Sequence, residues 1–121
     1  MLTIGTIVLG VNDVAAATTF WHGALGYVPR EPGNDTWVTL APPSGPGAHL
    51  SLMLSETQVQ AYPRIHLDLY ADDQAAEVER LVSLGAKRVD WDMYPEDPDF
   101  VVLEDPDGNR FCVIDKGPGE D

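Results

Sequence analysis

The chain has 121 residues, of which 7 are Lys or Arg and 20 are Asp or Glu, so its formal net charge is −13 at pH 7. This charge repels phosphate backbones and anionic lipid, which argues against nucleic acid and membrane as partners. The single cysteine excludes an intramolecular disulfide, and no apolar stretch approaches the roughly 18 residues of a membrane span. We therefore expect one domain that builds its own core, is cytoplasmic and carries no signal peptide.

One motif occurs twice along the chain. Thr6-Ile-Val-Leu-Gly-Val-Asn-Asp13 opens the first copy, and His66-Leu-Asp-Leu-Tyr-Ala-Asp-Asp73 opens the second. In both copies the final Asp lies seven residues after the first position, where its side chain can cap the helix that follows. The duplication predicts repeat one over about residues 3–54, a connector over 55–63, repeat two over 64–115 and a frayed tail over 116–121. Two related halves are expected to form a cleft, the usual place for a small ligand.

Each repeat is predicted to run in the order βαβββ. The strands expected in repeat one are Ile4–Val11, Val28–Arg30, Trp37–Leu40 and His49–Leu54. Those expected in repeat two are Arg64–Tyr70, Arg88–Trp91, Phe100–Leu103 and Arg110–Ile114. Apolar residues recur at helical spacing between the first two strands of each repeat, namely Val14, Ala17, Trp21 and Ala24, then Ala75, Val78, Leu81 and Val82. The predicted fold class is α+β, with two βαβββ repeats forming a curved mixed sheet, an open cleft and helices on the outer face.

The period of two along a strand assigns side chains to the core or to the cleft. The core assignment includes Leu50, Leu52, Leu54, Phe111 and Val113. The expected cleft also includes Trp91, an aromatic loop residue. Its lining is therefore a mixture of aromatic and polar side chains. The candidate ligand-binding residues are Trp37, Thr39, Ser51, Met53, His66, Asp68, Tyr70, Trp91, Phe100, Glu104, Arg110 and Cys112.

The two βαβββ units, their strand–Asp–helix–Leu-Gly openings and the ending Phe100-Val-Val-Leu-Glu-Asp-Pro-Asp-Gly-Asn-Arg-Phe-Cys-Val-Ile-Asp115 resemble the vicinal oxygen chelate superfamily. Its members include glyoxalase I, extradiol dioxygenases, fosfomycin-resistance transferases and bleomycin-resistance proteins. Within the superfamily, the segment from Arg64 to Ala86 is similar to a glyoxalase-like subgroup. The resemblance implies the fold, but this fold supports many chemistries, so function depends on the site.

The resemblance also implies where a metal would bind. Metal-dependent members place ligands, usually His and Glu, on the first and last strands of each half. These positions match Thr6, Met53, His66 and Cys112, of which only His66 agrees with the pattern. Zinc, iron or manganese needs three or four good donors around an open position, so the sequence favours a protein without metal. A divalent metal would need the substrate, or a neighbour such as Asp68 or Glu104, to complete a set with His66 and Cys112.

Each reactive candidate has a structural alternative. His66 beside Asp68 is a usable general base, or a hydrogen-bonded strand histidine. Cys112 is a nucleophile if Arg110 or protonated His66 lowers its pKa, or it fills packing volume. The aromatic residues form walls for a planar or cationic ligand, or ordinary core.

Two functions follow from these alternatives. The first is a metal-free protein that binds a cationic or aromatic small molecule, as bleomycin-resistance proteins sequester drugs. The second is a metal-dependent or acid–base lyase, isomerase or dioxygenase of the glyoxalase-like type that uses His66 as its catalytic residue. We expect a homodimer in either case, because many superfamily members build the cleft across a twofold axis.

Overall fold

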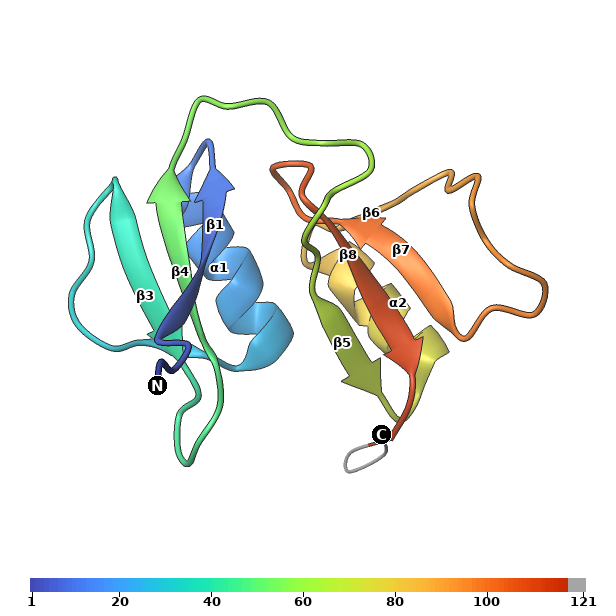
Figure 1. The fold of residues 1–121 in the computed structure, drawn as a ribbon, viewed down its shortest axis with the longest axis horizontal. Coiled ribbons are helices and arrows are strands. Elements are labelled where there is room, and N and C mark those ends of the chain that lie inside the picture. The colour runs from blue at the N-terminus through green and yellow to red at the C-terminus, as the bar shows by residue number, and fades with distance from the viewer. Residues whose placement is uncertain (118–121) are drawn as a thin grey trace. The chain divides into compact units, whose positions relative to one another are not determined.

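The structure is a computed structural model that describes residues 1–117, and it divides into two compact units on either side of the Gln58–Val59 bond. Each unit holds one helix and one four-stranded mixed sheet (Figure 1), so the predicted α+β class with two βαβββ repeats is confirmed. The division falls inside the expected connector over residues 55–63. Across residues 1–117, neither helix has the length and apolar character needed to cross a membrane.

The first unit contains β1, α1 and then three more strands. Their bounds are β1 Thr6–Val11, α1 Val14–Leu25, β2 Val28–Pro29, β3 Trp37–Ala41 and β4 His49–Leu54. The sheet order is β1-β4-β3-β2, in which β1 pairs with β4 in parallel and the other pairs are antiparallel. The crossover through α1 is what allows the first and last strands of the repeat to run in the same direction.

The second unit repeats this plan. Its elements are β5 Asp68–Ala71, α2 Gln74–Ser83, β6 Lys87–Arg88, β7 Phe100–Glu104 and β8 Arg110–Asp115. The sheet order is β5-β8-β7-β6, again with a parallel pair, β5 with β8, and two antiparallel pairs. Of the tail predicted over residues 116–121, Lys116 and Gly117 have no regular structure and the rest lies outside the described residues.

The two capping aspartates act as the motif predicts. Asp13 accepts a hydrogen bond from the Ala16 amide at 3.1 Å, and Asp73 accepts one from the Ala76 amide at the same distance. Each carboxylate satisfies an amide that the first helical turn leaves without a partner. Gly26 ends α1 in the left-handed region, at φ 72°, a conformation that glycine adopts without steric cost.

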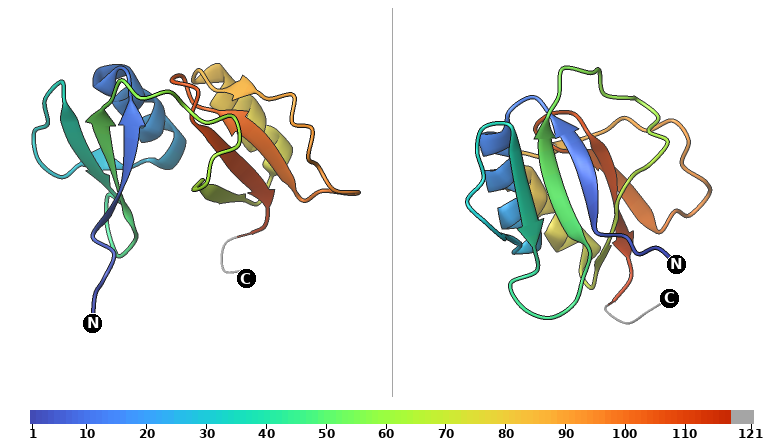
Figure 2. Two further views of the ribbon diagram at one scale, coloured as in Figure 1. Left: turned by 45° about the horizontal axis from the view of Figure 1, so that its top comes forward. Right: turned by 60° about the vertical axis from the view of Figure 1, so that its left-hand side comes forward.

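Each helix covers one face of its own sheet and leaves the other face open, as the two views of Figure 2 show. In the first unit the covered face includes Leu40 and Leu52, which are fully buried, and α1 adds Phe20 and Trp21 in edge-to-face contact at 5.0 Å. In the second unit, buried residues of β7, β8 and α2 form the core: Leu103, Phe111, Val113, Val78 and Leu81. Alternation along the strands therefore assigned most core positions correctly.

Several predicted strands have different bounds in the structure. The strand predicted over Arg64–Tyr70 begins only at Asp68, and the one predicted from Ile4 begins at Thr6. In the β5–β8 register Asp68 lies opposite Cys112, so the residues before His66 extend past the start of β8 and have no strand beside them. The strand predicted over Arg88–Trp91 is the two-residue β6, Lys87–Arg88.

Two burial assignments were wrong. Leu54, assigned to the core, is 43% exposed at the end of β4, and Ala75, assigned to the apolar stripe of α2, is exposed. Cys112 lies on the open face as assigned, although it is only 8% exposed there. The Leu54 and Ala75 errors lie at the ends of their elements, where a periodic pattern continues but the neighbouring element no longer covers it.

Candidate functional site

The second unit has a cavity of about 610 Å³ on the open face of its sheet. This volume lies within the range of roughly 300–1,000 Å³ that is typical of small-molecule sites. The cavity is lined by Tyr62, Pro63, His66, Asp68, Tyr70, Trp91, Met93, Asp99, Phe100, Val102, Arg110, Phe111, Cys112, Ile114 and Lys116.

Side chains on one side of β7 and β8 form the floor of this cavity. On β8, Arg110, Cys112 and Ile114 are two residues apart and therefore point to the same side of the sheet. Val102 lies opposite Cys112 in the β7–β8 register, and Phe100 lies opposite Ile114. The floor is thus apolar at its centre, with a guanidinium at one end of the strand.

A stack of side chains built on Trp91 forms the wall at that end. The Tyr62 ring lies 5.2 Å from the Trp91 ring, and the guanidinium carbon of Arg110 lies 5.8 Å from the ring centroid. The Tyr62 hydroxyl donates to the two carboxylate oxygens of Asp92, at 2.9 and 3.0 Å. This hydrogen bond, with the negative charge of Asp92, raises the pKa of Tyr62. The contacts tie the connector to the loop that precedes β7.

Two further contacts hold Arg110 in this position. Its Nη1 donates to the backbone carbonyl of Ala61 at 2.7 Å, and its Nε lies 3.8 Å from Oε2 of Glu104. The Arg110 and Glu104 side chains are only 22% and 25% exposed. A charged pair with this degree of burial is less screened by solvent than a surface pair.

At the other end of β8, Lys116 lies over the ring of Tyr70, with 5.1 Å between Nζ and the ring centroid. The backbone carbonyl of Asp99 accepts from the Asp115 amide at 2.7 Å and from Nε2 of Gln74 at 3.1 Å. The cavity therefore extends along β8, with a cationic side chain at each end.

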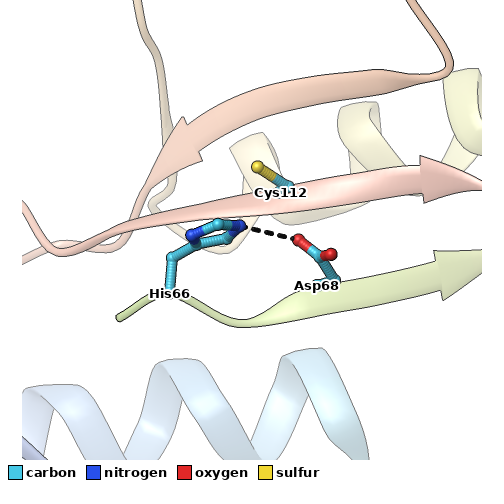
Figure 3. A group of neighbouring side chains, drawn as sticks. All are labelled: His66, Asp68 and Cys112. Atoms are coloured by element: carbon cyan, nitrogen blue, oxygen red, sulfur yellow. Dashed lines mark ion pairs between the residues drawn. The ribbon is translucent and has the colours of Figure 1, made fainter. Parts of the chain in front are cut away.

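His66 and Asp68 lie beside Cys112 on the β5 side of the floor (Figure 3). Nε2 of His66 lies 3.0 Å from Oδ1 of Asp68, and both side chains are about half exposed. One nitrogen, oxygen or sulfur atom from each of the three residues lies within 4.8 Å of the others. Burial, and secondly the negative charge of Asp68, raises the pKa of the Cys112 thiol from its ordinary value of 9.0 to about 11. The thiol is therefore protonated at neutral pH.

The matching strands of the first unit carry a chain of hydroxyl groups. The Ser51 hydroxyl lies 2.8 Å from the hydroxyls of both Thr6 and Thr39, and the Trp37 indole nitrogen donates to Thr39 at 3.1 Å. Ser51 is fully buried. These groups use one another as hydrogen-bonding partners, as buried polar groups must.

The strand registers correct one of the four residues that the sequence matched to the metal-ligand positions. Ser51 pairs with Val8 and Thr39, and Cys112 pairs with Asp68 and Val102. The counterpart of Cys112 in the first repeat is therefore Ser51. Met53 was wrong for this position; it pairs with Trp37 as Ile114 pairs with Phe100, so Met53 corresponds to Ile114.

The superfamily's metal-ligand pattern does not fit this chain. With the corrected register, its four positions hold Thr6, Ser51, His66 and Cys112. The two hydroxyls bond to each other at 2.8 Å. His66 is the one residue of the four that matches a usual ligand, and its Nε2 contacts Asp68. Two hydroxyls are poor donors for zinc, iron or manganese, so the four positions supply at most two strong ligands, His66 and Cys112.

Seven of the candidate ligand-binding residues line the 610 Å³ cavity: His66, Asp68, Tyr70, Trp91, Phe100, Arg110 and Cys112. Glu104 contacts the cavity only through Arg110. Trp37 and Thr39 line a second cavity of about 180 Å³ in the first unit, and Ser51 and Met53 belong to that unit's sheet.

Sequence reasoning omitted eight lining residues from its candidates: Tyr62, Pro63, Met93, Asp99, Val102, Phe111, Ile114 and Lys116. Val102 is two residues from Phe100 on β7 and faces the same side of the sheet, so strand alternation could have identified it. Tyr62 and Met93 lie in segments without hydrophobic periodicity. No sequence pattern therefore predicts that their side chains line the cavity.

The sequence model of the glyoxalase-like domain matches residues 6–114. No curated protein matches the chain significantly. Many solved structures share the fold, among them the following three. A possible glyoxalase from Bacillus cereus is 19% identical, with a TM-score of 0.69, over 94% of this chain and 99% of that one. Protein ATC0852 from Agrobacterium tumefaciens is 21% identical, with a TM-score of 0.69, over 97% and 99%.

The third is a mutant of the fosfomycin resistance protein FosX from Listeria monocytogenes, complexed with Mn(II) and 1S,2S-dihydroxypropylphosphonic acid. It is 14% identical, with a TM-score of 0.74, over 98% of this chain and 93% of that one. Together, the matched family model and the shared βαβββ repeats show that the chain belongs to the glyoxalase-like family of the vicinal oxygen chelate superfamily.

Proposed function

We propose that this protein binds an aromatic small molecule in the cavity of its second unit, without a metal ion, as sequestering members of the superfamily do. The observation that carries the proposal is a cavity of about 610 Å³ whose wall holds Trp91 and Tyr62. Apolar floors and aromatic walls supply most of the affinity of small-molecule sites, and a few polar groups orient the ligand. His66, Asp68 and Arg110 are the polar groups available for that task.

The chemistry of the floor favours binding over covalent catalysis. A nucleophilic cysteine needs a lowered pKa, whereas that of Cys112 is raised to about 11. Its acidic neighbour Asp68 disfavours the thiolate, and Cys112 lies opposite it in the strand register. In this proposal Cys112 contributes packing surface to the floor.

The proposal is tested by comparing two tryptophan variants. Trp91→Ala removes the ring that forms the wall, and Trp37→Ala removes a ring from the first unit. A panel of neutral and charged aromatic compounds is screened by thermal shift, and hits are measured by calorimetry with and without chelator. We expect Trp91→Ala to weaken binding at least about fivefold, since a buried aromatic contact contributes roughly 1–3 kcal/mol. Equal affinity in both variants, or affinity lost with chelator, would refute the proposal.

A second candidate function is metal-free acid–base catalysis. It rests on the 3.0 Å contact between Nε2 of His66 and Oδ1 of Asp68, because a carboxylate that holds an imidazole fixes its orientation and tautomer. The same ring lines the cavity, where it would be within reach of a bound ligand. Once a ligand is found, its turnover by wild type and by His66→Ala separates the two functions. A catalytic His66 is expected to affect turnover far more than affinity.

A further inference from the structure

We propose that the cavity selects neutral or anionic aromatic ligands and rejects cationic ones, and that Arg110 sets this preference. The inference rests on the proposed function, since it names the chemical class that the same cavity takes. It runs against the simplest expectation from the net charge of −13, which would draw a cation toward the protein. The selectivity follows from one contact in the wall.

A cation gains most from an aromatic ring when it lies within about 6 Å of the ring centroid. In this cavity the guanidinium carbon of Arg110 already lies 5.8 Å from the centroid of Trp91. A second cation at that ring would replace Arg110 or lie close to its positive charge. A neutral ring or an anionic group meets no such penalty, and an anion beside Arg110 gains a charged hydrogen-bonding partner.

Arg110 is fixed in this position rather than free to withdraw. It donates to the Ala61 carbonyl at 2.7 Å, and its Nε lies 3.8 Å from Glu104. Glu104 reduces the field of the guanidinium but does not line the cavity, whereas Arg110 does. A bound molecule therefore meets the positive partner of this pair first.

Three acidic side chains lie in or near the cavity, and two of them already have a partner. Asp92 accepts the Tyr62 hydroxyl through both of its oxygens, and Asp68 contacts His66. Asp99 lies beside the far end of β8, because its carbonyl bonds the Asp115 amide. Ile114 is four positions along β8 from Arg110, or about 13 Å at 3.3 Å a residue. At physiological ionic strength, charges separated by more than about 8 Å are largely screened, so Asp99 has little effect on a charge at Trp91.

Three probes with the same ring system test this inference: 2-naphthoate, 2-naphthalenemethanol and 2-naphthylmethylammonium. Their affinities are measured by calorimetry at neutral pH on the full chain. We expect the ammonium compound to bind at least about tenfold more weakly than the other two, since like charges a few ångströms apart repel strongly at a partly buried site. Added salt should narrow that difference.

Arg110→Gln removes the charge and leaves Glu104, so the order should reverse in favour of the ammonium compound. Arg88→Gln is the matched control, because it removes another guanidinium paired with a glutamate, Glu79, at an exposed site outside the cavity. It should leave the order unchanged. Arg110→Lys keeps the charge and should retain the rejection of the cation. Circular dichroism verifies that each variant is folded. If Arg110→Gln does not fold, the affinities of the three probes for Arg110→Lys provide the test.

The outcomes separate this inference from the proposed function. Equal or tighter binding of the ammonium compound to the wild type would overturn the charge selectivity while leaving the cavity as a ligand site. If Arg110→Gln and Arg88→Gln changed the relative affinities of the three probes equally, the role of Arg110 would be overturned. The cavity would still stand as a ligand site. Binding of none of the three probes, or binding that Trp91→Ala does not weaken, would refute the aromatic site and the selectivity with it.

Discussion

The reactivity of Cys112 gives a quantitative test of the cavity floor. Alkylation by iodoacetamide requires the thiolate, and the pKa of Cys112 is raised from 9.0 to about 11. Two pH units correspond to a thiolate fraction about 100-fold lower at neutral pH. We therefore expect the folded protein to react at least about 100-fold more slowly at pH 7.5 than the chain unfolded in urea. Burial of the sulfur adds to this factor, because Cys112 is only 8% exposed.

The assay follows the mass of the intact protein with time, and the single cysteine ensures that one adduct reports one site. The rate in the folded protein should rise about tenfold for each pH unit up to pH 10, below the raised pKa. Asp68→Asn should accelerate the reaction only in part, because burial raises the pKa more than the charge of Asp68 does. Asp72→Asn, which removes the same charge at an exposed position, is the control.

Either of two results would refute this reasoning. A folded-state rate equal to that of the unfolded chain at pH 7.5 would mean that Cys112 is an accessible, ordinary thiol. A rate that levels off below pH 9 would mean that the pKa is lowered, which would restore Cys112 as a candidate nucleophile.

Three further predictions concern metal content, the β7–β8 turn and assembly. Elemental analysis of protein purified without chelator should find no stoichiometric zinc, iron or manganese; a metal that His66→Ala removes would contradict the poor fit of this donor set to such ions. Asp105→Ala should lower the free energy of unfolding by about 1–3 kcal/mol in urea titrations, because this buried carboxylate accepts the Asp107 and Asn109 amides at 3.0 and 2.9 Å. Asp115→Ala, at an exposed position, should change the free energy of unfolding little. Sedimentation at micromolar concentration should find a homodimer, and a monomer would exclude it.

The sequence predicted those features that local chemistry determines. Asp13 and Asp73 were identified as helix caps from their place before an apolar stripe, and both accept the expected amide. Gly108 follows Asp-Pro-Asp in the turn before β8, and its φ of 94° is one that glycine adopts without steric cost. These features depend on a few neighbouring residues, so a single sequence is enough to recognise them.

Contacts between distant segments were beyond such reasoning. Nothing in the connector indicates that Tyr62 would lie 5.2 Å from Trp91, 29 positions further along the chain. The contact of Arg110 with Ala61 likewise depends on the path of the connector rather than on a local preference. The sequence placed Arg110 on the open face, but only the fold shows that its charge lies against an aromatic ring.

The matching registers of the two sheets have a consequence for engineering. Central cavity positions on β7 and β8 have counterparts in the first repeat with matching strand neighbours, such as Thr39 for Val102 and Ser51 for Cys112. Each repeat thus shows which side chains an equivalent backbone position already accommodates in the other repeat. Residues exchanged between the copies, Cys112→Ser first among them, would change the ligand-facing surface of one copy while keeping to side chains that evolution has used at the matching place in the other.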